Sequence, residues 1–293
     1  LKSLTGKNYV ERTVLKAIKN NIALYAIHTN LDNIDTGVNR MIADRLSLQN
    51  IRILEPKKDG LKMLITYVPN NHVEALRTAL FAQGAGSIGE YSECHFSVDG
   101  IGTFKGSENS NPAVGQKGVR ESVSEQRIEL VFPSYIESKV ISTLKTTHPY
   151  EEVAYSVLSL NNKNENVGSG MIGEISEPLN EMEFLKNLKI KLKTDCIRYT
   201  SLLNSKIKKV ALCGGSGRFL LNAAKQSGAD VFITSDFKYH EFFDAENRIL
   251  IADIGHYESE QFTMDLIADF LRKNFPKFAI HLSKVNTNPI NYL

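Results

Sequence analysis

The sequence has few cysteines, little net charge and no long apolar run, and each scarcity excludes a class of protein. Its three cysteines, Cys94, Cys196 and Cys213, are odd in number and form no CxxC pair, which indicates neither a disulfide framework nor a zinc ribbon. The net charge is only +2 and the lysines are spread, so we expect no nucleic-acid partner. No apolar run approaches the roughly 18 residues of a spanning helix, and no secretory segment opens the chain. We therefore expect a cytoplasmic protein, in a reducing compartment and without a membrane partner.

The sequence also lacks an initiator methionine, and its first six residues read as the middle of a structural element. We expect the chain to be part of a longer protein, so that a site built partly from upstream residues is incomplete here. Its 293 residues predict two or three units, at roughly 150 residues per domain. The 42% hydrophobic and 23% charged fractions are ordinary for a globular protein.

Helical and strand patterns alternate at both ends of the chain, which predicts an α/β fold. The early part predicts a helix over 8–20, a buried strand over 22–27 and a helix over 38–46, before a polar linker at 55–60. The late part predicts strands near 197–199, 209–213, 229–235, 249–254 and 278–282, and helices near 181–188, 219–226 and 259–274.

The middle of the chain has a different order of elements. Strands are predicted over 61–68, 91–98, 127–132 and 153–160 with helices over 71–83 and 136–144, a turn at 100–104 into another strand, and a polar excursion over 105–126. This order is similar to a ferredoxin-like α+β unit. We therefore predict three segments: a first lobe at 1–58, an inserted domain at 61–160 and a second lobe at 165–293.

A strand predicted to end near Ile254 leads through a glycine to His256 and Glu260. Because an α-helix repeats about every 3.6 residues, side chains four apart share one face. An imidazole and a carboxylate at this spacing suit a divalent cation. The alternative is an exposed helix start, where acidic residues are favoured by the helix dipole.

Three further clusters follow predicted strands: His28 with Asp32, the glycine turn at 214–217, and Asp236 with His240. In a doubly wound sheet such strand ends share an edge, so the clusters could line one cleft. The glycine turn has two interpretations, a tight turn or a backbone cradle for an anion, and it lacks the Lys-Ser/Thr ending of a P-loop.

Together these motifs resemble the Nif3-like family of dinuclear-metal proteins, often labelled GTP cyclohydrolase I type 2 homologs. The resemblance rests on His28-Thr29-Asn30-Leu31-Asp32, Cys213-Gly214-Gly215-Ser216-Gly217, Thr234-Ser235-Asp236-Phe237-Lys238-Tyr239-His240 and Gly255-His256-Tyr257-Glu258-Ser259-Glu260. It implies two Nif3-type α/β lobes in one sheet-based unit, and two divalent cations (zinc, iron or manganese) held by Asp32, His256 and Glu260 with a His-His pair upstream of Leu1. It also implies a homo-oligomer, by analogy a hexamer.

The middle segment resembles the PII-like or CutA-like insert of longer family members, through Gly100-Ile101-Gly102-Thr103-Phe104 and His148-Pro149-Tyr150-Glu151-Glu152. The second motif could be a ligand or regulatory site, but a proline-restricted turn capped by acids also explains it. We favour a structural or gating role for the insert.

The leading functional hypothesis is a metal-dependent hydrolase acting on a nucleotide-like or phosphorylated small molecule. His28 and His240 would orient a carboxylate or shuttle protons, or would be ordinary loop residues. One alternative is a metal-handling or regulatory binding protein without catalysis, and another is an interaction scaffold. GTP ring opening itself needs a zinc site with cysteine ligands, and the three cysteines are not arranged for it.

Overall fold

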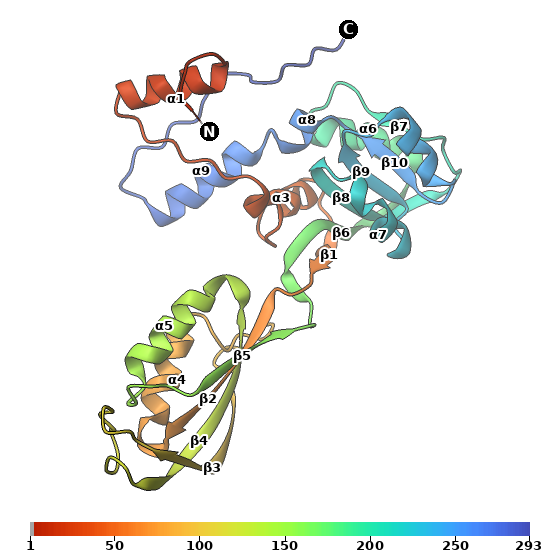
Figure 1. The fold of residues 1–293 in the computed structure, drawn as a ribbon. Helices are drawn as coiled ribbons and strands as arrows, with labels where there is room; N and C mark the ends of the chain where they lie inside the picture. The colour runs from red at the N-terminus through yellow and green to blue at the C-terminus, as the bar shows by residue number, and fades with distance from the viewer. Residues whose placement is uncertain (1–2) are drawn as a thin grey trace.

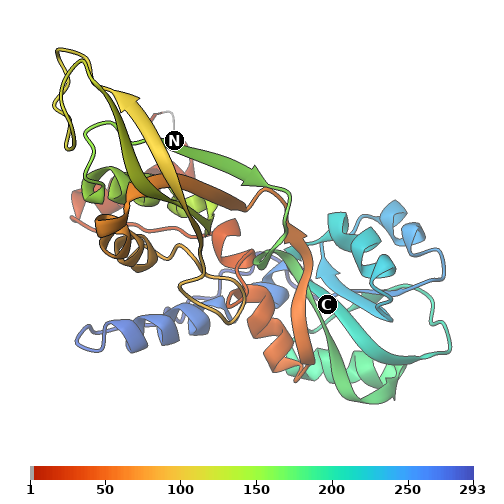
Figure 2. The same cartoon turned by 90° about the horizontal axis from the view of Figure 1, so that it is seen from below.

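The computed structural model describes residues 3–293, so the expected element at the very start of the chain lies partly outside the described residues. Two sheets form separate parts of the molecule, joined where β1 leads into β2 and β5 into β6 (Figures 1 and 2). The elements in chain order are α1 (Tyr9–Lys19), α2 (Thr29–Asp32), α3 (Val38–Arg45), β1 (Gln49–Lys57), β2 (Leu61–Pro69), η1 (Asn70–His72), α4 (Val73–Ala82), β3 (Phe96–Lys105), β4 (Arg120–Pro133), η2 (Ser134–Ile136), α5 (Glu137–Thr147), β5 (Tyr155–Leu160), β6 (Asn164–Asn180), α6 (Glu181–Lys191), β7 (Arg198–Tyr199), β8 (Lys206–Ser216), η3 (Arg218–Leu220), α7 (Leu221–Gln226), β9 (Val231–Ser235), η4 (Tyr239–Ala245), β10 (Leu250–Asp253), α8 (His256–Glu260) and α9 (Thr263–Asn274).

The larger sheet has the strand order β1-β6-β8-β9-β10-β7, with β8, β9 and β10 parallel to one another and the other pairs antiparallel. Two of its central strands, β9 and β10, are buried at every position because both faces of the sheet are covered. In β9, Val231 and Ile233 pack in the core that α3 and α6 cover, whereas Phe232 packs in the core on the other face, below η3 and α7. The helices therefore leave the carboxyl ends of the parallel strands free to carry polar residues.

The smaller sheet has the antiparallel order β3-β4-β2-β5 and carries α4 and α5 on one face (Figure 1). The chain passes through it as β-α-β-β-α-β, which is the ferredoxin-like arrangement. Alternate residues of its central strands, such as Leu64 and Leu130, pack with Leu76 and Leu144 of the two helices. The fold is thus a mixed α/β fold with two sheets.

Two predicted strands are wrong. Residues 22–27 and 278–282 form no strand, and their apolar side chains are exposed: Tyr25 is 89% and Phe278 73% exposed. Apolar composition alone does not make a strand, because the backbone needs a neighbour to pair with. No strand within residues 3–293 pairs with either segment.

Two predicted breaks are also wrong in part or in full, because strands occupy them. The first half of the polar segment at 55–60 belongs to β1, where Pro56 is tolerated since β1 is an edge strand and its missing N–H costs no ladder bond. The glycine-rich turn at 100–104 is the middle of β3, with Gly102 opposite Val123 of β4. A single predicted helix over 259–274 is instead the two helices α8 and α9. None of the helices between residues 3 and 293 is long and apolar enough to cross a membrane.

Candidate metal centre

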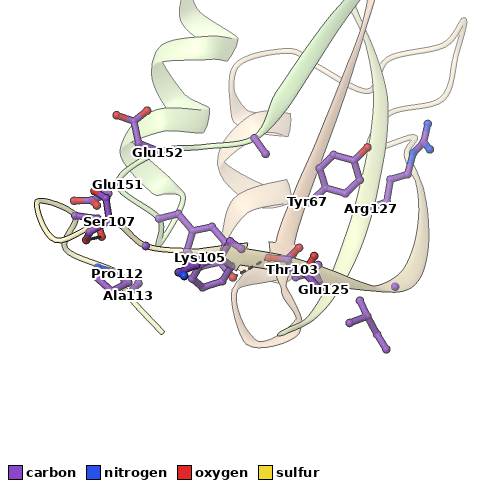
Figure 3. Close-up of a pocket in the computed structure, with 18 of the residues that line it drawn as sticks. Tyr67, Thr103, Lys105, Ser107, Pro112, Ala113, Glu125, Arg127, Glu151 and Glu152 are labelled. Atoms are coloured by element: carbon purple, nitrogen blue, oxygen red, sulfur yellow. Dashed lines mark hydrogen bonds between the residues drawn. The ribbon is translucent and has the colours of Figure 1, made fainter. Parts of the chain in front are cut away.

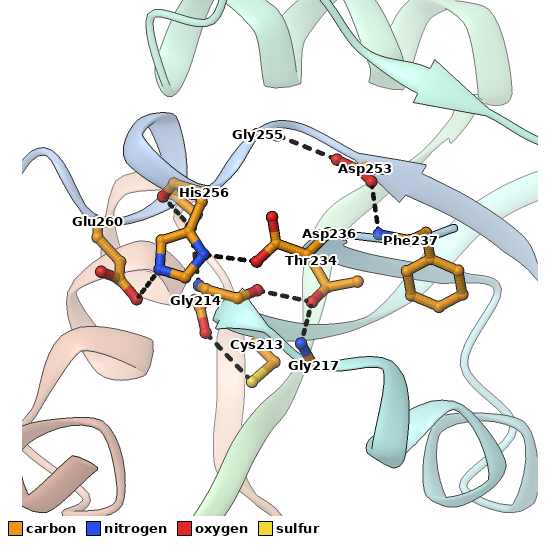
Figure 4. Close-up of polar contacts among 12 residues, drawn as sticks. Cys213, Gly214, Gly217, Thr234, Asp236, Phe237, Asp253, Gly255, His256 and Glu260 are labelled. Carbon is orange, nitrogen blue, oxygen red and sulfur yellow. Dashed lines mark hydrogen bonds and ion pairs between the residues drawn. The ribbon is translucent and has the colours of Figure 1, made fainter. Parts of the chain in front are cut away.

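Polar residues follow the three parallel strands at one edge of the larger sheet (Figure 4). The glycine stretch ends β8, Asp236 follows β9, and His256 begins α8 three residues after the end of β10. The strand register brings these ends together, because Ser216 lies opposite Ser235 and Thr234 opposite Asp253. Ligands of open α/β sheets bind at such an edge.

His256 lies between two carboxylates at this edge (Figure 4). Its Nδ1 is 2.5 Å from Oδ2 of Asp236, and its Nε2 is 3.5 Å from Oε1 of Glu260, one helical turn later. The chain reaches this position through Gly255, whose φ of +92° suits glycine and where a Cβ would lie 2.1 Å from the Glu258 carboxylate. The sequence spacing therefore places His256 and Glu260 on one face, and the tertiary fold adds Asp236.

Asp32 reaches the same cluster from α2. Its pKa is raised by burial, against the attraction of His28 and His256. The pKa of Glu260 is likewise raised, by burial first, with the Asp32 and Asp236 carboxylates raising it further. Burial lowers the pKa of His256, but the hydrogen bond with Asp236 and the nearby carboxylates outweigh burial, so the net direction is upward. Asp32, from the predicted first lobe, is thus close enough to His256 and Glu260, from the second, to raise their pKa values.

Asn39 of α3 fastens the Asp32 loop to the sheet edge. Its side-chain NH₂ donates to the carbonyl of Asp32 at 2.8 Å, and its Oδ1 accepts the N–H of Gly214 at 2.8 Å. Asn39 is 2% exposed, so both bonds are shielded from water. Sequence reasoning missed this residue, although a polar side chain on the face that carries the apolar Val38 and Ile42 was a signal that could have been followed.

The backbone of the glycine stretch packs beneath the cluster, and three of its N–H groups are not free to bind an anion. The N–H groups of Gly214, Gly215 and Gly217 already donate to the side chains of Asn39, Ser259 and Thr234. These three groups therefore do not support the anion-cradle interpretation, and residues 214–216 form the end of β8, so the stretch is not a tight turn either. Gly215, with a φ of +63°, lies directly under the cluster, since a Cβ there would be 2.5 Å from Oε1 of Glu260 and 3.4 Å from the His256 ring.

Cys213, just before this stretch, is buried. Burial, followed by the charges of Asp32 and Glu260, raises the pKa of its thiol to about 12. Its S–H donates to the neighbouring carbonyl of Gly214 at 3.4 Å. The thiol is therefore a packing group beside the cluster.

The two histidines predicted to support the site have different positions. His28 is exposed at the start of α2, and its charge lowers the pKa values of Asp32 and Glu260. His240 is exposed in η4 and packs edge-on against Tyr239. In the part of the chain that the structure describes, no hydrogen bond or ion pair joins His240 to the cluster. The supporting role of His240 stays a prediction.

The cluster is not a complete metal shell. Among residues 3–293, no group of three or more His, Cys, Asp or Glu side chains is arranged to hold a metal ion. The donors that do converge are oxygen and imidazole nitrogen atoms, which suit hard or borderline divalent cations. The side chains thus supply a contacting pair, His256 and Glu260, with Asp32 and Asp236 beside it.

Comparison with known proteins gives consistent matches along the chain. A family model described as Duf34/NIF3 (NGG1p interacting factor 3) matches residues 1–289. A Bacillus subtilis protein named GTP cyclohydrolase 1 type 2 homolog is 38% identical over 299 residues, which cover 100% of this chain and 80% of that protein. A Listeria monocytogenes protein of the same name is 37% identical over 298 residues, with 96% and 77% coverage.

Solved structures agree with the sequence matches. The crystal structure of a Bacillus cereus protein related to NIF3 superposes with a TM-score of 0.82 at 37% identity, covering 100% of this chain and 80% of that one. The Staphylococcus aureus protein SA1388 superposes with a TM-score of 0.72 at 30% identity, with 100% and 78% coverage. The mixed α/β fold with two sheets is therefore shared with these proteins.

Proposed function

Since this chain belongs to the DUF34/NIF3 family, we propose that it is a metal-dependent hydrolase in which Asp32, His256 and Glu260 hold two divalent cations. The observation that carries the proposal is the position of His256, fixed on one side by a carboxylate and open on the other toward a second carboxylate. The cations are zinc, iron or manganese, which accept oxygen and imidazole ligands.

The contacts of His256 fit a metal ligand. In known metal sites the ligating histidine gives its other ring N–H to a carboxylate or carbonyl, which sets the tautomer and the ring orientation. With the proton on Nδ1 for Asp236, Nε2 presents a lone pair to Oε1 of Glu260 at 3.5 Å. A divalent cation between Nε2 and the Glu260 carboxylate would satisfy both acceptors, in the place that a proton on Nε2 takes when the imidazole is charged. Two atoms bound to one zinc ion at tetrahedral angles are roughly 3.3–3.5 Å apart, which is the separation found here.

The charge of the cluster supports the same proposal. Asp32, Asp236 and Glu260 place three carboxylates around one imidazole. Burial raises the pKa of Glu260, and the negative charge of Asp32 raises it further. Such a set attracts cations and repels a free phosphate group. A divalent cation would relieve the repulsion, and Asp32 would hold it together with His256 and Glu260.

The chemistry follows from these roles. When bound, paired divalent cations acidify water and polarise a phosphoryl group or a ring carbon for hydrolysis. Asp236 holds the orientation of His256, and Asn39 holds the loop that carries Asp32. His28, exposed at the edge of the cluster, is placed to take a proton and pass it to solvent.

We propose a nucleotide-like or phosphorylated small molecule as the substrate. The relatives named GTP cyclohydrolase 1 type 2 homolog suggest a nucleotide. Ring opening of GTP on a cysteine-ligated zinc is not supported by this chain, because the Cys213 thiol is buried and turned to the Gly214 carbonyl. Hydrolysis at a phosphoryl group needs only the oxygen and nitrogen donors that converge here.

The test compares variants of the three proposed metal ligands with a control variant at another histidine, His240. The protein is stripped with a chelator, reloaded with zinc, manganese or iron, and measured for bound metal by elemental analysis and for hydrolysis of nucleoside phosphates and phosphomonoesters. We expect His256→Asn, Asp32→Asn and Glu260→Gln to lose metal and turnover, and His240→Asn to keep both. Retention of metal and turnover by the first three variants would reject the assignment.

Metal bound stoichiometrically without turnover on any substrate would instead favour the metal-handling or regulatory alternative. A variant that keeps the far-ultraviolet circular dichroism of the parent but loses metal separates loss of the site from loss of the fold.

The remaining expectations stay predictions. We propose that residues 1–58 and 165–293 form the two lobes that build the metal centre, and that residues 61–160 are a PII/CutA-like insert. We also propose a cytoplasmic homo-oligomer, by analogy a hexamer, which native mass spectrometry would test directly.

A further inference from the structure

The four-stranded sheet contains a cavity that the metal centre does not use (Figure 3). It measures about 780 Å³ and lies between the second half of β3 with the turn after it and the loop from α5 to β5. Small-molecule sites commonly occupy about 300–1,000 Å³. Its lining joins two motifs of the sequence, the glycine-rich stretch at 100–104 and the His-Pro-Tyr-Glu-Glu stretch at 148–152.

A buried carboxylate, Glu125 of β4, lines this cavity. It is 8% exposed, and its Oε1 accepts a hydrogen bond from the Tyr150 hydroxyl at 2.8 Å. Its Oε2 lies against the backbone of β3, where a Cβ on Gly102 would be 2.1 Å away. Within residues 3–293 this second oxygen accepts no hydrogen bond. A mostly buried carboxylate is stabilised by the donors that reach it, and with Tyr150 on Oε1 the second oxygen can accept a hydrogen bond from a ligand in the cavity.

The His-Pro-Tyr motif aims Tyr150 at this carboxylate. His148 is buried, its Nε2–H donates to the carbonyl of Tyr67 at 2.8 Å, and its Nδ1 accepts the N–H of Tyr150 at 3.1 Å. This pairing holds the neutral ring, and burial lowers the pKa of His148 accordingly. Burial and the hydrogen bond to Glu125 raise the pKa of Tyr150, so its hydroxyl remains a donor. The motif therefore does more than restrict the chain at Pro149, because it places the Tyr150 hydroxyl on Glu125.

The walls and charges of the cavity define what it can hold. Apolar and aromatic side chains form part of the lining, namely Tyr67, Val98, Ile101 and Phe104. The charged residues of the lining are four carboxylates and two cations, namely Asp99, Glu125, Glu151, Glu152, Lys105 and Arg127. Arg127 is already paired with Glu129 at 2.7 Å, outside the lining. The excess of carboxylates favours a cationic guest over a phosphate.

We propose that this cavity is a second binding site, for a small molecule with a flat apolar body and a protonated amidine or amine group that donates to Glu125. The apolar wall contacts the body, and the glycine at position 102 lets the carboxylate and a flat ligand approach β3 closely. The inference goes beyond the proposed hydrolase, because the site lies on the other sheet and uses none of the metal-centre residues.

Isothermal titration calorimetry of the full chain tests the site with benzamidine as the probe and benzoate as its anionic counterpart of the same shape. We expect benzamidine to bind and benzoate to bind at least tenfold more weakly. Glu125→Gln keeps the size of the side chain but removes its charge, and should weaken benzamidine binding at least tenfold. Glu137→Gln, on α5, removes one charge outside the lining, and its ion-pair partner Lys62 also lies outside the lining, so this variant should leave binding within twofold.

A second variant, Gly102→Ala, tests the site independently of Glu125→Gln. Gly102→Ala leaves the charge of Glu125 in place but puts a methyl group where its Oε2 lies, so it should also weaken benzamidine binding at least tenfold. Thermal unfolding of each variant shows whether the fold is kept, and Asp32→Asn should bind benzamidine as the parent does. Absence of benzamidine binding at millimolar concentration, equal binding of benzoate, or unchanged affinity in a folded Glu125→Gln protein would each overturn the proposal.

Discussion

Replacement of Gly215 by alanine tests whether the cluster of Asp32, His256 and Glu260 is a metal centre. Gly215 has a φ of +63°, and an added Cβ would lie 2.5 Å from Oε1 of Glu260. Since Cβ atoms do not approach other atoms within about 3.0 Å, the carboxylate must move by roughly 0.5 Å or more. Metal–ligand distances tolerate only about ±0.2 Å. We therefore expect metal affinity to fall at least tenfold.

The loss of folding free energy caused by Gly215→Ala can be separated from its effect on metal binding. A left-handed conformation costs a residue other than glycine roughly 1–2 kcal/mol. Gly228 provides the matched control, because its φ is +71° and an added Cβ would have its nearest contact at 4.0 Å, with the Lys209 side chain. Gly228→Ala should thus lose about the same 1–2 kcal/mol of folding free energy while keeping full metal affinity.

The assay combines urea unfolding with competition for zinc against a chromogenic chelator, for the parent and both alanine variants. The expected pattern is a loss of stability in both variants, larger in Gly215→Ala because the Glu260 carboxylate must also be displaced, with weaker zinc binding in Gly215→Ala alone. If Gly215→Ala bound zinc as tightly as the parent, the carboxylate above it would not be a ligand, and the proposed centre would be wrong.

Three further predictions follow from buried groups. Asn39→Ala should cost about 1–3 kcal/mol in urea unfolding, because the Gly214 N–H loses its acceptor, and should weaken metal binding as the Asp32 loop loosens. Iodoacetamide should modify the exposed Cys196 in the native protein and reach Cys213 only on unfolding, since burial raises the pKa of that thiol to about 12; native-state mass spectrometry that finds Cys213 modified at the rate of Cys196 would contradict its burial. The folded state lowers the pKa of His148, so its contribution to stability is present above the unfolded pKa of about 6.5 and is lost as pH falls toward the folded value. Urea unfolding at several pH values should show a smaller loss of stability on acidification in His148→Gln than in the parent.

Local patterns predicted most of the elements well. Periodic apolar residues identified α1 and α6, and continuous apolar runs identified β9 and β10, because burial on one face or on both leaves its period in the sequence. The spacing of His256 and Glu260 likewise predicted their shared face, since both belong to one helical turn. These features depend on neighbours within a few residues.

Features that depend on distant partners were not predictable in the same way. The apolar run at 22–27 reads as a strand, yet no pairing within residues 3–293 makes it one. The segment at 55–60 reads as a linker, yet β6 pairs with its first half, which is the end of β1. Pairing is decided by which backbone lies alongside, and a residue's own side chain does not specify that backbone.

The sequence by itself determined the donor types and their local order, because the chemistry of an imidazole or a carboxylate belongs to the residue. Only the tertiary structure decided that Asp236 and not His240 meets His256, and that Asn39 ties the Asp32 loop to β8. It also decided that Tyr150 meets Glu125. Each of these pairs is formed where strand ends or a long connection bring distant residues within hydrogen-bonding distance, and that distance is a property of the packed chain.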